Sequence, residues 1–363
     1  MKAITSTATL AAIGLLALSA CVHNDSERPT TGETDESTAT LNDARGANSD
    51  QILDVTAQAA SSPPNFGSVV QSAGVGVASA SGVSTTFDGT DLSIAISRDD
   101  GSALTLNTGS DPSEGTDPFE SIIAGHSARY WTVLRIGTDG ISTARAVVTS
   151  KDSDTADYLT IGYWMHLAGD LTEFSFTGAA IGTFVDGPEL SLASPASLPA
   201  QGRASYYGPA SGAYAVLHGA DGEGPPGSME SGGFNSTVEL TADFAANTID
   251  GCVGCRDGVP LFGTLYDTDT GEGTDVLFED SGFRLHLDPT SLDADGTFLG
   301  QQMRLEHSEY SFASTRGAWG GQFSNISDSA GDPRLVAGTF GAEATSTGGS
   351  EGAFLGSFFG TKE

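Results

Sequence analysis

The chain has 363 residues, of which 38% are hydrophobic, so it is long enough for two domains with their own cores. It carries 15 Lys and Arg against 47 Asp and Glu, and the formal net charge of −32 excludes nucleic acid and anionic membrane surfaces as partners. A basic protein or a cation is the favoured kind of charged partner, although the charge also suits a role in solubility alone. The 48 glycines favour a turn-rich, all-β protein.

Residues 1–20 have the pattern of a signal peptide. Lys2 precedes an uncharged run, residues 8–17, which is too short to cross a bilayer and is typical of a signal-peptide core. The run leads into LSAC, ending at Cys21, which resembles the lipobox of bacterial lipoproteins. The resemblance implies that Cys21 carries the lipid anchor and is the protein's only membrane contact. Val22, where Asp would retain the protein at the inner membrane, favours the outer membrane. A plain secretory signal with a chance cysteine is the alternative.

Residues 21–64 are rich in Ser, Thr, Asp and Glu and poor in aromatic residues, which predicts a disordered acidic tether. Residues 65–195 alternate instead, as a β-rich domain does. Leu92, Ile94 and Ile96 share one face of a predicted strand. Residues 158–167 (YLTIGYWMHL) are apolar on both faces, which predicts a central strand that is covered on two sides.

An Ala/Ser/Pro linker (190–201) separates this region from a second predicted domain, residues 198–363. Residues 237–244 show the clearest alternation in this domain. The residues expected to face inward are Val238, Leu240, Ala242 and Phe244, and those expected to face outward are Thr237, Glu239, Thr241 and Asp243. Three closing segments alternate apolar residues with glycine, which marks the bends that small barrels require: Trp319/Gly321/Phe323, Val336/Gly338/Phe340 and Phe354/Gly356/Phe358. We expect an antiparallel barrel of about eight strands, whose interior is just wide enough for side chains. A ligand would therefore meet the loops or the junction between the domains.

The closing segments 317–323 (GAWGGQF), 332–342 (DPRLVAGTFGA) and 352–362 (GAFLGSFFGTK) resemble those of the transferrin-binding protein B β-barrel domain. Residues 203–214 (RASYYGPASGAY) resemble the strand that opens the same barrel. The resemblance covers 198–363 and implies that residues 65–195 form the antiparallel "handle" domain that precedes such barrels. It also implies a lipoprotein anchored to the outer membrane, at the cell surface, that binds a solute or protein ligand. In this family the ligand is often iron- or haem-linked, and a TonB-dependent receptor is the expected partner.

Cys252 and Cys255 lie close enough in the sequence for backbone geometry to decide whether they can form a disulfide. Strand residues three apart point to opposite faces and lie about 10 Å apart, so a disulfide closes only if residues 251–255 turn. Such a pair forms either a structural disulfide or a redox motif, and we predict a structural disulfide between Cys252 and Cys255. The absence of a βαβ pattern disfavours thioredoxin-like chemistry, and Arg256 in place of His excludes c-type haem attachment.

No metal site, cofactor or catalytic site is predicted. The acidic stretch from Asp267 departs from a calcium loop at Glu272 and Phe278, which favours a solvated loop, and Asp288, Asp293 and Asp295 are interpreted in the same way. The six histidines lack the spacing of a metal motif: His23, His126, His166, His218, His286 and His307. Four aromatic residues are interpreted as barrel packing rather than as a ligand platform: Tyr206, Tyr207, Tyr214 and Trp319.

A non-enzymatic binding lipoprotein is the leading hypothesis, because no acid, base and nucleophile come together in the sequence. The alternative is a structural or immune-shielding envelope lipoprotein without nutrient cargo. A third hypothesis is an enzyme with a barrel like that of the outer-membrane lipid A palmitoyltransferase. It is disfavoured because the outward charges would not be tolerated in a lipid-facing band: Glu239, Asp243, Arg284 and His286.

Overall fold

The computed structural model confirms the predicted all-β fold class. It describes residues 39–40, 77–78, 80–87, 91–98, 103–107, 119–123, 126–137, 140–150, 158–170, 175–186, 196–220, 226, 228–266, 273–278, 281–300, 302–308 and 311–363. Within these ranges the chain forms strands, and no helix there is long and apolar enough to cross a membrane. The predicted signal peptide, Cys21 and most of the predicted tether lie outside the described residues.

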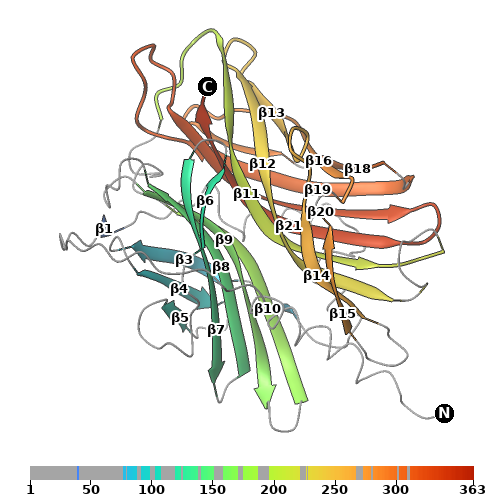
Figure 1. Ribbon diagram of the computed structural model, residues 1–363. Helices are drawn as coiled ribbons and strands as arrows, with labels where there is room; N and C mark the ends of the chain where they lie inside the picture. The colour runs from blue at the N-terminus through green and yellow to red at the C-terminus, as the bar shows by residue number, and fades with distance from the viewer. Residues whose placement is uncertain are drawn as a thin grey trace.

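Two smaller sheets come first along the chain and pack face to face (Figure 1). The four-stranded sheet consists of β1 (Ala39–Thr40), β3 (Ala80–Phe87), β4 (Leu92–Arg98) and β5 (Ala103–Asn107). The six-stranded sheet consists of β2 (Val77–Ala78), β10 (Ser175–Asp186), β9 (Tyr158–Asp170), β8 (Gly140–Ser150), β7 (His126–Gly137) and β6 (Phe119–Ile123). All pairings are antiparallel except the one between β2 and β10.

The core between these sheets follows from the predicted alternation. The four-stranded sheet contributes Phe87, Leu92, Ile94, Ile96, Leu104 and Leu106, and the six-stranded sheet contributes Ala144, Ala146, Trp164 and Phe184. A buried Asp186 ties the sheets together, because its Oδ2 accepts a hydrogen bond of 2.7 Å from the backbone N–H of Thr85. Tyr163 and Trp164 point to opposite faces of β9 and both are buried. This confirms the prediction of a central strand covered on two sides.

The third and largest sheet is the predicted barrel (Figure 1). Its strands are β11 (Arg203–Leu217), β12 (Met229–Asp243), β13 (Thr248–Val253), β14 (Leu261–Tyr266), β15 (Gly273–Phe278), β16 (Phe283–Ser291), β17 (Thr297–Gly300), β18 (Met303–His307), β19 (Phe312–Phe323), β20 (Leu335–Ser346) and β21 (Glu351–Lys362). The pairing follows the order β17-β19-β20-β21-β11-β12-β13-β16-β18, with β14 beside the first half of β12 and β15 beside β14.

A bend in the chain nearly closes this sheet into a barrel. Strands β17 and β18 follow one another in sequence, yet β17 pairs with β19 at one end of the sheet and β18 pairs with β16 at the other. Counted as one bent segment, they occupy the last of eight positions around the ring. The eight-stranded barrel is therefore confirmed, and its free edges are removed by this bend rather than by a continuous hydrogen-bonded ladder.

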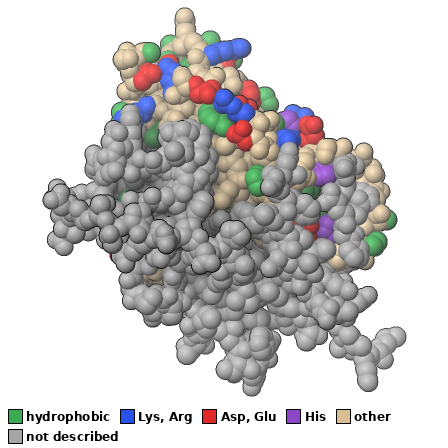
Figure 2. Space-filling model, viewed as in Figure 1, with side chains coloured by type: hydrophobic (Ala, Val, Ile, Leu, Met, Phe, Trp, Pro, Cys, Tyr) green, Lys and Arg blue, Asp and Glu red, His purple; other side chains and the backbone are tan. Residues whose placement is uncertain are grey.

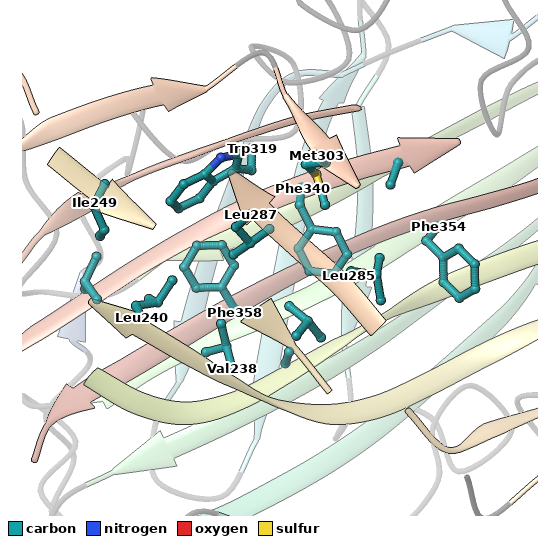
Figure 3. Packing of buried hydrophobic residues seen from close by; sticks show 14 of the residues in the cluster. Val238, Leu240, Ile249, Leu285, Leu287, Met303, Trp319, Phe340, Phe354 and Phe358 are labelled. Atoms are coloured by element: carbon teal, nitrogen blue, oxygen red, sulfur yellow. The ribbon is translucent and has the colours of Figure 1, made fainter. Parts of the chain in front are cut away.

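The aromatic and glycine residues of the closing segments form cross-strand pairs inside the barrel. Four phenyl rings, two of them from the closing segments, lie over a glycine directly opposite: Phe358 on Gly338, Phe340 on Gly356, Phe298 on Gly321 and Phe234 on Gly212. A Cβ at Gly338 would lie 2.7 Å from the Cζ of Phe358. These glycines thus provide room for rings, an arrangement that stabilises curved sheets. Figure 3 shows Phe340, Phe358 and Trp319 converging with aliphatic residues of β12 and β16.

The six-stranded sheet covers one side of the barrel. Strands β9 and β10 contact β11, β20 and β21, and the Ser357 hydroxyl donates a hydrogen bond of 3.1 Å to the Gly162 carbonyl oxygen. Outward residues of this side are therefore buried, among them Ala213, Ala337 and Leu355. On the opposite side, formed by β12, β13, β16 and β18, buried positions alternate with more exposed ones along β16, β18 and residues 238–243 of β12, whereas Thr237, which was predicted to face outward, is buried.

Candidate functional site

Side chains fill the interior of the barrel along its length. Tyr206, Phe323, Phe298 and Trp319 pack in sequence near one end, with centroid separations of 5.1 to 6.0 Å. The chain of rings continues through Phe358, Phe340, Phe234, Phe354 and Tyr214. Tyr206, Tyr214 and Trp319 are at most 1% exposed, which confirms that they pack the barrel. The interior is a core of close-packed rings.

A buried polar group lies inside the barrel near the end of β11. The Tyr214 hydroxyl donates a hydrogen bond of 2.7 Å to Glu230 Oε1, and His218 Nε2 lies 3.4 Å from Glu230 Oε2. Burial raises the pKa of the Tyr214 phenol well above its ordinary value, and the charge of Glu230 raises it further. The phenol therefore stays protonated and serves as a donor. Such pairing satisfies Glu230 where desolvation would otherwise be costly.

The other end of the barrel is held by the C-terminal strand. Lys362 Nζ lies 2.7 Å from Asp328 Oδ2 and also binds Asp332, and the Tyr206 hydroxyl donates to the Pro333 carbonyl oxygen at 3.0 Å. The hydrogen bond from Lys362 lowers the pKa of the Asp328 carboxyl, and the same contact raises the pKa of the Lys362 ammonium. These interactions anchor the loop between β19 and β20 and belong to the fold.

Polar groups on the uncovered side form a row across four strands. Glu239 of β12 pairs with Cys252 of β13, Cys252 pairs with His286 of β16, and His286 pairs with Arg304 of β18. We call Glu239, Cys252, His286 and Arg304 the outer row. Directly opposed residues of an antiparallel sheet have Cβ atoms about 4.5–5.5 Å apart, so neighbours in the outer row interact. Figure 2 shows acidic, basic and histidine side chains interspersed over the barrel.

The two cysteines of the predicted pair lie at disulfide distance, with Cα atoms 5.8 Å apart, and the structure joins them. Cys252 belongs to β13, which continues to Val253, and the turn begins at Gly254 with a φ of 81°. Left-handed backbone of this kind favours glycine. The predicted turn is thus present, although it begins later than the predicted 251–255. Cys252 is buried and Cys255 is exposed.

His286 completes a group that sequence reasoning missed. One ligand atom each from Cys252, Cys255 and His286 lie within 4.8 Å of one another. The Nε2 atom of His286 also lies 2.8 Å from Glu306 Oε2. Alternation along β16 places His286 on the outer face, but no local spacing links it to the cysteines. Only the register between β13 and β16 brings the three together.

A cation–aromatic cluster flanks the cysteines. The Arg256 guanidinium lies 4.2 Å from the centre of the Tyr207 ring, and the Tyr207 hydroxyl donates to Asp257. Arg256 Nη1 also lies 3.4 Å from Glu363 Oε1 and 3.7 Å from Glu239 Oε1. Burial, followed by the hydrogen bond to Asp257, raises the pKa of the Tyr207 phenol. Tyr207 thus packs outside the barrel, unlike Tyr206 and Tyr214.

The remaining candidates are structural or fall outside the described residues. Asp288 Oδ1 accepts a bond of 2.8 Å from Arg304 Nε, and Asp295 Oδ1 accepts from the Thr297 hydroxyl at 2.7 Å within its own turn. His307 is buried against the Phe283 ring, and its Nε2 lies 2.7 Å from the Ser281 carbonyl oxygen. Residues 267–272 of the acidic stretch lie outside the described residues, as does His23.

No known protein family and no curated protein matches this chain. The likeness to the transferrin-binding protein B barrel therefore remains a prediction that depends on the segments named in the sequence.

Proposed function

We propose that this protein is a non-enzymatic binding lipoprotein, anchored at the surface of the outer membrane through Cys21. The observation that carries the proposal is a barrel whose interior is filled and whose one side is covered by the six-stranded sheet. A scaffold of this kind offers a ligand its loops and its uncovered side. The ligand is a solute or protein, with iron- or haem-linked cargo as the first class to test and a TonB-dependent receptor as the partner.

The uncovered side suits recognition because its outward groups are polar and reachable. Arg304 has 62% of its side chain exposed and Glu306 has 68%. The buried titratable groups near the barrel end are, by contrast, held in structural pairs, as Glu230 is by Tyr214 and His218. Exposed charge on a rigid sheet supports selective association with a charged partner more than it supports chemistry.

Capture from host or environmental fluid tests the binding role. The full chain, immobilised through an added C-terminal tag, is incubated with the fluid, and retained molecules are identified by mass spectrometry. A His286→Ala, Arg304→Gln double variant serves as the matched control for the uncovered side. Enrichment of a specific ligand that this variant loses supports the proposal. Equal retention by both chains would contradict a binding role for this side.

Haem and anchoring are tested separately. Titration of the full chain with haem at micromolar concentration is followed through the Soret band, and an unshifted band removes haem from the ligand classes. Metabolic labelling with a radioactive fatty acid tests the anchor, because label should appear in the wild-type chain and be absent from Cys21→Ser. Label retained by Cys21→Ser would contradict the proposed anchor.

A structural or immune-shielding role is the second candidate. The filled interior is compatible with it, because a barrel packed with side chains can act as a spacer as readily as a receptor. A TonB-dependent receptor encoded beside this chain would favour uptake, and a lack of specific capture together with no such neighbour would favour the structural role.

A further inference from the structure

We propose that Cys252, Cys255 and His286 form a binding site for Zn²⁺ when the disulfide between the cysteines is reduced. The ligand atoms of the three residues already lie within 4.8 Å of one another. They converge on the uncovered side of the barrel, where Cys255 is exposed and the His286 side chain is 25% exposed. A metal could therefore reach the group without opening the core. The proposal does not rest on the ligand proposed above, although His286 belongs to the side that is tested there.

The donor set matches the chemistry of Zn²⁺. Two thiolates and an imidazole are ligands that this ion prefers, and Cys-x-x-Cys is a common spacing for one half of a zinc site. Two thiolates also neutralise the charge of the ion, and the neutral imidazole adds a third ligand without changing that charge. The strands hold the ligands in place, because Cys252 and His286 are directly paired and the turn at Gly254 returns Cys255 toward them.

Glu306 supplies the support that metal-binding histidines usually have. Its Oε2 lies 2.8 Å from His286 Nε2, which leaves Nδ1 as the ring nitrogen for the metal. A carboxylate on the second nitrogen orients the ring and makes the imidazole a better donor. Water is the candidate for the fourth position, because the carboxylate of Glu239, directly opposite Cys252 in the outer row, lies 3.7 Å from the Arg256 guanidinium.

Reduction is required because thiolates, not disulfide sulfurs, bind the metal. A dithiol reductant donates two electrons and two protons to the disulfide bond, which breaks to give two thiols while the reductant closes to a cyclic disulfide. When Zn²⁺ binds, the thiols release two protons to solvent and form two zinc–sulfur bonds. The oxidised chain therefore lacks the site.

Titration with Co²⁺, a spectroscopic substitute for Zn²⁺, tests the proposal. The full chain is reduced with dithiothreitol, desalted without oxygen and titrated alongside the oxidised chain. We expect the reduced chain to develop thiolate-to-cobalt charge-transfer absorption and the visible bands of tetrahedral Co²⁺. Added Zn²⁺ should bleach both, and the oxidised chain should show neither. Reduced chain without charge-transfer absorption would overturn the proposal.

Variants assign the ligands. Glu306→Gln should weaken Co²⁺ binding by about 10–100-fold, as outer-shell substitutions do, and His286→Ala should weaken it further. Arg304→Gln is the matched control in the outer row, because it removes a positive charge beside the site and should not weaken binding. His286→Ala keeps both cysteines, and a cooperative urea denaturation curve verifies that it has folded. Wild-type affinity in folded His286→Ala would overturn the site.

The third cysteine is controlled within the same experiment. A Cys252→Ser, Cys255→Ser double variant retains Cys21 and should lack the charge-transfer band at the Co²⁺ concentrations that saturate the wild type. A band of wild-type intensity in this variant would assign the signal to Cys21 and overturn the proposal.

Discussion

The covered and uncovered sides of the barrel share one interior but have opposite exteriors. On β21 of the covered side the outward residues are at most 2% exposed: Ala353, Leu355, Ser357 and Phe359. On β18 of the uncovered side the outward residues Arg304 and Glu306 are exposed. Inward residues are buried on both sides. Alternation of apolar and polar residues along a strand therefore indicates that its outer face is exposed to solvent. A strand that is apolar on both faces indicates that a second layer covers the outer one.

The two sides also differ in what their outward residues contact. On the covered side the six-stranded sheet approaches closely enough for the Ser357 hydroxyl to donate a hydrogen bond to the Gly162 carbonyl oxygen. On the uncovered side, Glu239, His286 and Arg304 of the outer row lie within reach of solvent and ligands, as does Cys255. Substitutions on the two sides should consequently differ most in their effect on stability.

The two sides should differ most in the stability that is lost when a charged residue is introduced at an outward position. Ala337→Asp places a carboxylate at a fully buried position between β20 and the six-stranded sheet. Because a buried, unpaired charge loses several kcal/mol of solvation, the free energy of unfolding should fall by about 3 kcal/mol or more. Thr241→Asp, at an exposed position of β12, should change it by about 0.5 kcal/mol or less. Urea denaturation measures both, and equal losses would show that the two exteriors do not differ.

A methyl group added to the shared interior should have the next largest effect. In Gly356→Ala the new Cβ would lie 2.5 Å from the Cζ of Phe340, so the ring must move. Overpacking of this kind costs about 1–3 kcal/mol. Gly352→Ala in the same strand is the matched control, because its nearest neighbour, Val216 Cγ2, is 3.8 Å away. Similar thermal midpoints for the two variants would contradict the cross-strand packing of ring on glycine.

The bond between the sheets should contribute less. Ser357→Ala removes a buried donor to the Gly162 carbonyl oxygen and should lower the free energy of unfolding by about 0.5–1.5 kcal/mol. Thr290→Val removes a hydroxyl that bonds the Leu299 carbonyl oxygen at an exposed site, where water can replace it. Its effect on the denaturation midpoint should be smaller. A larger effect from Thr290→Val would contradict the role assigned to the covered side.

The smallest effect is expected from the Lys362 pair and depends on pH. The lowered pKa of Asp328 provides stability that is present above 3.8, its ordinary value, and is lost as the pH falls through the folded value. The raised pKa of Lys362 provides stability that is complete below 10.5 and is lost as the pH rises through the folded value.

Lys362→Met should therefore be less stable than the wild type between these limits, and the difference should shrink at both extremes and at high salt. Denaturation over a pH series measures it. A difference that does not vary with pH would mean that Lys362 acts through packing alone.

The period of the strands and the contents of the barrel could be predicted from sequence. Side chains of a strand alternate because of local backbone geometry. The face on which Val238 and Leu240 lie, or Phe340 and Gly338, can therefore be predicted before any neighbouring strand is identified. The alternation of Phe283, Leu285 and Leu287 in the sequence likewise predicts that His286 faces outward. Cys252 and Cys255 were predicted to meet because a short turn is also a local property.

Features that depend on pairing between distant segments could not be predicted. The bend between β17 and β18 closes the barrel because each half pairs with a different end of the sheet. The coverage of Ala337 and Leu355 depends on a sheet formed by residues far earlier in the chain. His286 reaches the cysteines only through the register of β13 with β16, and a shift of one residue would turn it into the core. Local alternation thus sets the face of each residue, whereas register and packing between sheets set its neighbours.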